Sequence, residues 1–120
     1  MGDYRKLLAW KAAHELAVEC YRTTRTWPTT ERYGLTAQLR RAATSVPANL
    51  AEGAARSGRR EFAHHVNIAL ASLSEVEYLL QLAADIGMAA DADRATLGPL
   101  VQRAGQLTFK LYRSLQSPAP

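Results

Sequence analysis

The stretch RRAATSVPANLAEGAARSGRR (Arg40–Arg60) decides the fold, because it combines a helical repeat with a helix breaker. Apolar or small residues recur through this region at spacings of three and four, at Leu35, Leu39, Ala42, Val46, Leu50 and Gly53. That spacing places them on one face of a helix. Pro47 interrupts the repeat, and an interior proline costs a helix about 3 kcal/mol. Two interpretations stay open: Pro47 kinks one helix, or Ser45 caps a fresh helix with Pro47 in its first turn.

The helical spacing continues on both sides of this stretch, and breakers divide the chain into four segments. The breakers are TWPTTE (26–31), RSGRR (56–60) and IGMAADAD (86–93). We therefore expect helices over about 8–25, 31–55, 59–86 and 92–115, with a frayed tail from about 117. Short connections between long helices favour antiparallel neighbours. The predicted fold class is all-α, an up-down-up-down four-helix bundle in a single domain over 1–120.

Composition sets the class of protein. The chain has 120 residues, 48 % of them hydrophobic and 22 % charged, which is typical of a soluble globular protein. The single Cys20 cannot form an internal disulfide, so we expect a cytoplasmic protein with a packed, unreactive thiol. No apolar run approaches the ~20 residues that cross a bilayer, so we expect no membrane association. The net charge of +4 permits nucleic-acid binding without demonstrating it.

The predicted helix over 59–86 carries more apolar residues than one core face needs. A sufficient core stripe is formed by Phe62, Val66, Ala69, Leu73, Val76 and Leu80. A second set lies on the opposite side, at Ile68, Ala71, Leu79, Leu82 and Ile86. A small bundle has no central helix, so this second face needs a partner to cover it. We predict an oligomer with an interface at Ile68, Leu79, Leu82 and Ile86; the alternative is a rotated helix with one wide core face.

Polar residues accompany both of these helices. Glu75 lies within the second apolar face, where a carboxylate needs a partner, and Arg41 or Arg56 could supply it from the same chain or a neighbour. We predict a partly buried structural network that comprises Arg41, Ser45, Asn49, Glu52 and Glu75. The alternative is an ordinary solvated face.

Three arginines gather around the predicted loop at 56–60. Arg59 and Arg60 lie at a helix N-terminus, where the helix dipole disfavours cations. We predict that Arg56, Arg59 and Arg60 contact an anionic partner such as RNA or DNA; the alternative is a solvated loop. Arg22 and Arg25 end the first predicted helix, where the dipole favours cations, so no function is assigned to them.

No catalytic arrangement is evident. A di-iron bundle needs two Glu-x-x-His motifs, and this chain has one, Glu61 to His64. His64 and His65 are adjacent, diverge by about 100° on a helix, and are predicted to be surface or interface residues. We predict a protein that is not an enzyme, with no cofactor, no metal and no small-molecule substrate.

Two long stretches carry a family resemblance. Over about 7–88 the chain resembles the small bacterial four-helix bundle proteins known as 23S rRNA intervening-sequence proteins. The stretches that carry the resemblance are LAWKAAHELAVECYRTTRTWPTTERYGLTAQLRRAATSVPANLAEGAAR and EFAHHVNIALASLSEVEYLLQLAADIG. The resemblance implies a homopentameric ring of up-down bundles. The bundle is also similar to nucleic-acid-binding accessory proteins of diversity-generating retroelements, so the resemblance implies nucleic-acid binding through repeated basic surfaces by fold analogy alone. The alternative is a ring-shaped scaffold or adaptor that binds a protein partner.

Overall fold

The structure, a computed structural model, describes residues 3–56 and 58–116. It contains four long helices: α1 (Leu8–Thr24), α2 (Leu35–Ala55), α3 (Arg59–Asp85) and α4 (Asp91–Gln116). Short 3-10 turns precede the first two, η1 (Tyr4–Lys6) and η2 (Thr29–Glu31). The described ranges hold no strand, so the prediction of an all-α chain with four helices is confirmed. None of these helices combines the length and hydropathy that a bilayer-spanning segment needs.

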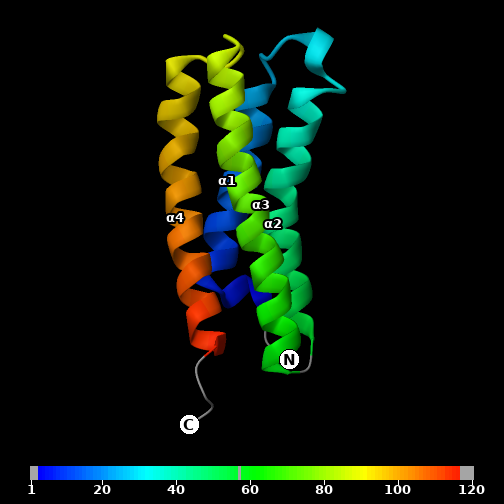
Figure 1. Ribbon diagram of the computed structural model, residues 1–120, viewed down its shortest axis with the longest axis vertical. Coiled ribbons are helices and arrows are strands. Elements are labelled where there is room, and N and C mark those ends of the chain that lie inside the picture. The colour runs from blue at the N-terminus through cyan, green and yellow to red at the C-terminus, as the bar shows by residue number, and fades with distance from the viewer. Residues whose placement is uncertain (1–2, 57, 117–120) are drawn as a thin grey trace.

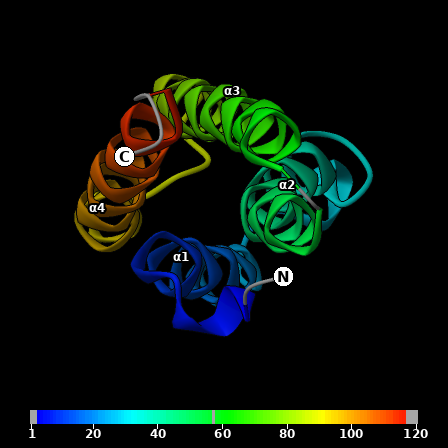
Figure 2. The ribbon, with the colours of Figure 1, turned by 90° about the horizontal axis from the view of Figure 1, so that it is seen from below.

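The four helices run up, down, up and down along one long axis (Figure 1). Seen end-on, they stand in chain order around that axis, and α4 returns to lie beside α1 (Figure 2). The bundle measures 50 × 22 × 19 Å. The most extensive helix contact is between α2 and α3. The α2–α3 helix pair therefore positions most residues of the candidate site.

The core confirms the repeat that decides the fold. All six residues of the α2 stripe are buried, namely Leu35, Leu39, Ala42, Val46, Leu50 and Gly53. Gly53 permits the tight α2–α3 contact, because a Cβ built there would lie 2.8 Å from the Cβ of His65 and 3.0 Å from the Phe62 ring. A larger residue at Gly53 would push the two helices apart.

The start of α2 differs from the prediction. The sequence predicts a helix from 31, whereas α2 begins at Leu35. Glu31 ends the separate turn η2, and its carboxylate accepts a hydrogen bond of 2.9 Å from the backbone N–H of Leu35. An acidic side chain at a helix N-terminus satisfies one of the free N–H groups there. Glu31 therefore caps α2 from outside instead of forming its first turn.

Pro47 lies inside one continuous helix. α2 runs without a break from Leu35 to Ala55, so the interpretation of a fresh helix capped by Ser45 is wrong. Pro47 is buried on the flank of α2 that faces α1, where it lines a groove with Ala17 and Tyr21. It faces away from α3. The proline ring thus fills the α1–α2 contact.

The loop after α1 is fastened to the beginning of α4. The indole Nε1 of Trp27 donates to Oδ2 of Asp93 over 3.2 Å, and the same oxygen accepts from the backbone N–H of Ala90 over 3.0 Å. Asp93 thereby reaches back over the first turn of α4 in the manner of a capping box. This contact ties the loop after α1 to the start of the neighbouring helix α4.

Candidate functional site: the α2–α3 seam and the arginine loop

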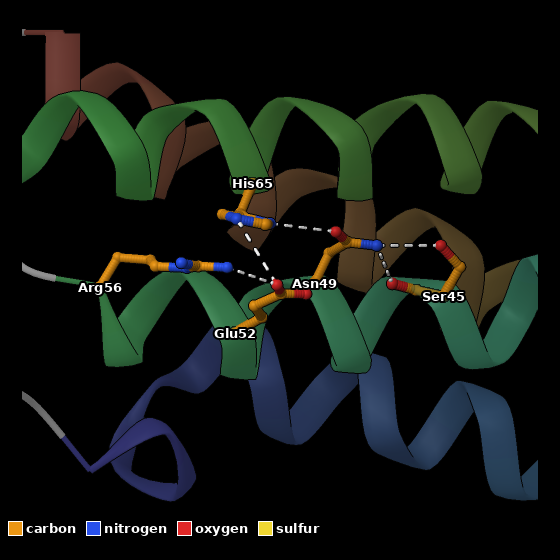
Figure 3. A network of polar contacts seen from close by, with 5 residues as sticks. All are labelled: Ser45, Asn49, Glu52, Arg56 and His65. Atoms are coloured by element: carbon orange, nitrogen blue, oxygen red, sulfur yellow. Dashed lines mark hydrogen bonds and ion pairs between the residues drawn. The ribbon is translucent and has the colours of Figure 1, made fainter.

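A chain of hydrogen bonds crosses from α2 to α3 through the seam between them (Figure 3). The hydroxyls of Ser45 and Ser72 lie 2.9 Å apart. Asn49 donates from Nδ2 to the carbonyl and hydroxyl oxygens of Ser45, at 2.9 and 3.0 Å. Its Oδ1 lies 3.2 Å from Nδ1 of His65 and must act as acceptor, so His65 donates from Nδ1. Asn49 therefore links both helices.

The outer end of the same seam is ionic. Oε1 of Glu52 accepts a hydrogen bond of 2.8 Å from Nη2 of Arg56 and lies 4.0 Å from Nε2 of His65. The Arg56 hydrogen bond, followed by the charge of His65, lowers the pKa of the Glu52 carboxyl below its ordinary value. The seam thus changes along its length from partly buried hydroxyl and amide groups to an exposed ion pair.

His65 is the member of this network that the sequence analysis missed. Its prediction as a surface or interface residue is wrong for the single chain, because only 9 % of its surface is exposed. The close approach at Gly53 brings the His65 backbone against α2. A usable signal was present: His65, Ala69, Ser72 and Val76 recur at spacings of four, three and four, which places them on one face.

Arg41 and Glu75 do not join this network within the chain. Both are exposed, and across 3–56 and 58–116 neither side chain makes a hydrogen bond or ion pair. Each lies one helical turn beyond the contact between Ser45 and Ser72, and in the same direction because α2 and α3 are antiparallel. Three of the five predicted residues, Ser45, Asn49 and Glu52, are therefore brought together.

The surplus apolar face of α3 is narrower than predicted. Leu79 is 4 % exposed and packs in the core of its own chain, so its assignment to the second face is corrected. The broad contact with α2 widens the buried arc of α3 and includes Leu79 in it. Ile68 and Leu82 are partly buried, and Ile86 is 56 % exposed. The remaining surplus face, hereafter the outer α3 face, comprises Ile68, Ala71, Leu82 and Ile86 with Glu75 among them.

The three loop arginines have different environments. Arg56 pairs with Glu52. Nη2 of Arg59 donates to the Ser114 carbonyl oxygen over 2.6 Å, close to the C-terminal end of α4. That contact places the Arg59 charge where the α4 dipole favours a cation, so its position at the start of α3 does not require a ligand. Arg60 is exposed and makes no ion pair within the described chain. Ser57 lies outside the described residues.

Arg59 and Arg60 border a shallow hollow of about 480 Å³ between the start of α3 and the end of α4. Its lining also includes His64, Asn67 and Tyr112, and among residues 3–56 and 58–116 no carboxylate contributes to it. The hollow therefore offers positive charge, hydrogen-bond donors and one aromatic ring. These are groups that suit a phosphate and its sugar or base.

The described residues that could bind a metal or act as a nucleophile do not form a cluster. Within the described ranges no three His, Cys, Asp or Glu residues gather as metal ligands would. Cys20 is buried, and burial raises the pKa of its thiol to about 12. A thiol that remains protonated is a poor nucleophile, which fits the prediction of a packed cysteine.

The protein is thus an all-helical four-helix bundle in which a network of polar side chains joins the second and third helices. The family model described as 23S rRNA-intervening sequence protein matches residues 5–111, so the chain belongs to that family. The resemblance stated from the sequence is confirmed, and the match extends beyond 88 into α4.

A solved structure is also similar to this chain. It is a crystal structure of a protein of unknown function from the S23 ribosomal protein family of Bacteroides thetaiotaomicron VPI-5482. The TM-score is 0.81 at 20 % sequence identity, over 88 % of this chain and 96 % of that one. At that identity the likeness shows the fold alone. None of the curated proteins compared matches this chain.

Proposed function

We propose that this protein is a non-enzymatic, cytoplasmic oligomer that binds nucleic acid through basic surfaces repeated around a closed ring, with five subunits as the expected number. The observation that carries the proposal is the hollow beside Arg59 and Arg60, whose described lining residues supply cationic and hydrogen-bonding groups and no carboxylate. Arg60 makes no ion pair among the described residues and is available to a phosphate. The family name, which refers to 23S rRNA, is consistent with such a ligand.

Repetition would make a modest site effective. Each phosphate neutralised by Lys or Arg releases counterions, and affinity increases with the number of contacts. A single hollow with one unpaired arginine binds weakly, whereas a ring presents several copies to one polyanion. The outer α3 face supports assembly, because it exposes apolar area beside an unpaired Glu75. Arg41, one turn beyond the same seam contact, supplies the complementary charge for Glu75 of a neighbouring subunit.

The test is a mobility-shift titration with structured RNA, duplex DNA and single-stranded DNA across a series of salt concentrations. Arg60→Ala should weaken binding to unrelated sequences to a similar extent, because phosphate contacts do not read sequence. The slope of log K against log salt should fall by about 0.9 for each duplex phosphate that the variant no longer neutralises. Arg103→Ala on α4 removes the same charge from an exposed position outside the hollow and is the matched control.

Two outcomes would contradict the proposal. An unchanged salt slope in Arg60→Ala would place the contact elsewhere on the surface. No binding at low salt by the wild-type protein would eliminate nucleic acid as the ligand.

The second candidate function is a ring-shaped scaffold or adaptor for a protein partner. The exposed rings of Tyr33 and Phe109 favour it, because exposed aromatic residues are common at protein interfaces. It becomes the preferred function if the ring assembles and the salt series shows no nucleic-acid binding.

A further inference from the structure

A second cationic surface lies on the other flank of α2, where it meets α1. A shallow groove of about 420 Å³ runs between the two helices. Its lining residues are His14, Ala17, Val18, Tyr21, Arg22, Arg25, Thr44 and Pro47. None of the described residues that line it carries a carboxylate. The sequence alone gives Arg22 and Arg25 no function, whereas the structure places both in the lining of one groove with Tyr21.

The guanidinium of Arg40 does not line the groove itself but is held against Tyr21, which does. It lies over the Tyr21 ring, 4.6 Å from the ring centroid. Its Nε donates to Oγ1 of Thr24 over 2.9 Å, and that hydroxyl donates in turn to the Cys20 carbonyl over 2.7 Å. Thr24 is only 3 % exposed, so the anchor is rigid. The four N–H donors on the two terminal nitrogens of Arg40 remain for a ligand.

The groove carries positive charge that the chain does not neutralise. Arg22 pairs with Glu19 over 2.6 Å. Neither Arg25 nor Arg40 makes an ion pair within 3–56 and 58–116. Two guanidinium groups with unsatisfied charge next to a 45 % exposed tyrosine are an unusual arrangement for a merely solvated face.

A second aromatic position lies on the same side of α1. The ring of His14 stacks on Trp10, with centroids 4.9 Å apart and planes inclined by 6°. His14 and Tyr21 are separated by seven residues, which is two helical turns or about 10 Å along the axis. His14 and Tyr21 thus present rings at two levels of the groove, and the arginines gather at the level of Tyr21.

We propose that the α1–α2 groove binds single-stranded nucleic acid, with unpaired bases against Tyr21 and His14 and with phosphates on Arg40 and Arg25. The inference rests on the proposed nucleic-acid function, and it adds a surface and a substrate class to it. Aromatic rings interleaved with arginines are the means by which proteins hold single strands, because every base has a stacking face. In a duplex the bases are already stacked and paired, so a duplex would leave these rings unused.

The charge also argues against a second copy of this chain as the occupant. An apposed copy carries a net charge of +4 and would have to place carboxylates against both Arg25 and Arg40, or bury their charges unpaired. A polyanion satisfies both arginines without such a coincidence.

The experiment compares Tyr21→Leu with Tyr78→Leu, a matched exposed tyrosine on α3, using a fluorescent oligouridine strand and a duplex RNA of equal length. Tyr21→Leu should bind the single strand about 5-fold to 150-fold more weakly, the range that removal of one base stack produces, and should bind the duplex as the wild type does. Tyr21→Phe should retain single-strand binding. Tyr78→Leu should change neither affinity.

A second variant keeps the test decisive if Tyr21→Leu does not fold. Arg25 is exposed and outside the core, so Arg25→Glu should fold normally and should weaken single-strand binding more than duplex binding. Arg103→Glu makes the same charge change outside the groove and should lower both affinities equally, if at all.

Several results would overturn the inference. Equal losses on the single strand and the duplex would make the groove a general cationic surface. Loss of oligomerisation in Tyr21→Leu would make it a subunit interface, and uridine monophosphate competing as strongly as the oligonucleotide would make it a nucleotide site.

If Arg60→Ala weakens binding while Tyr21→Leu and Arg25→Glu do not, the groove is not the single-strand site and the proposed function stands. Absence of binding to either probe at low salt removes both.

Discussion

The two flanks of α2 are built from different chemistry. On the α3 flank, Asn49 and Ser45 form hydrogen bonds to other side chains of the same chain, and Gly53 lets the helices approach closely. On the α1 flank, Pro47 lines a groove and Arg40 has terminal donors to spare. Polar residues on one helix can therefore have different roles, depending on whether they find hydrogen-bond or ion-pair partners within their own chain. Satisfied groups hold the fold together, and unsatisfied ones point to a partner.

We expect the greatest change at Arg41 and Glu75, two predicted network residues that make no ion pair among the described residues. If they pair between subunits in a buried contact, either Arg41→Ala or Glu75→Ala should weaken assembly by about 3–5 kcal/mol, because the remaining charge is buried alone. The double variant should lose less than the sum of the two. Sedimentation velocity and light scattering measure assembly, and Glu77→Ala is the exposed control on the same helix.

Two results would contradict a charge pair between subunits. A wild-type chain that remains a 13.2 kDa monomer at micromolar concentration would remove the interface altogether. Single variants with effects near zero on a stable oligomer would show that Arg41 and Glu75 belong to a solvated face.

The next prediction tests the close approach on the α3 flank. Gly53→Ala should destabilise the protein by about 1–3 kcal/mol, since its Cβ would meet the His65 Cβ at 2.8 Å and neither backbone can yield easily. Gly105→Ala on α4 is the matched control, because its Cβ would have nothing within 4 Å. Alanine there should stabilise the helix by about 0.5–1 kcal/mol. Urea unfolding followed by circular dichroism gives both values, and equal changes in the two variants would refute the close-packing argument.

Pro47 provides the corresponding test on the α1 flank. Pro47→Ala restores a backbone N–H and relieves the clash with the carbonyl of Ala43, effects worth about 3 kcal/mol. Removal of the buried ring offsets part of this gain at about 0.8 kcal/mol for each CH₂ taken from the core. We expect a more stable protein by about 1–2 kcal/mol in thermal unfolding, with assembly unchanged because the ring faces α1. Loss of assembly at unchanged helix content would show that the proline shapes the α3 flank as well.

The sequence predicted the local features and missed those that depend on distant contacts. The α2 stripe from Leu35 to Gly53 follows from spacing alone, and it is entirely buried. The prediction for Leu79 placed it on the wrong face, because the width of the buried arc on α3 depends on how closely α2 packs, which a helical wheel does not contain. The hydrogen bond from Arg59 to the Ser114 carbonyl joins residues 55 positions apart. No rule about a local helix dipole could anticipate it.

The same limit explains why the sequence predicts only part of the candidate site. Ser45, Asn49 and Glu52 share one side of α2 and group together from spacing, whereas their partner His65 was expected on the surface. The pairing of Arg40 with Tyr21 is not predictable in this way, because it requires the α1–α2 packing to bring two helices side by side. Tyr21 belongs to α1 and Arg40 to α2, so no spacing within one helix relates the two residues.

The smallest expected effect is at the exposed end of the seam, where Glu52 meets Arg56. The folded pKa of Glu52 lies below its ordinary value of 4.5, chiefly through the Arg56 hydrogen bond and next through the charge of His65. Such a carboxyl stabilises the fold above its unfolded pKa, and the contribution disappears as pH falls through the lowered folded value. Glu52→Gln should therefore be slightly less stable than the wild type at pH 7. The gap should begin to narrow near pH 4.5 and should close as the pH falls through the lower folded pKa of Glu52, because the carboxyl is then protonated and neutral like the amide. About half of each side chain is exposed, so the gap should be small. Thermal unfolding of both proteins from pH 7 down to pH 3 measures it. Arg56→Gln should behave in the same way if the ion pair is responsible. A large loss of stability at pH 7 in either variant would mean that the exposed end of the seam stabilises the fold as much as the partly buried hydrogen bonds of Asn49 do.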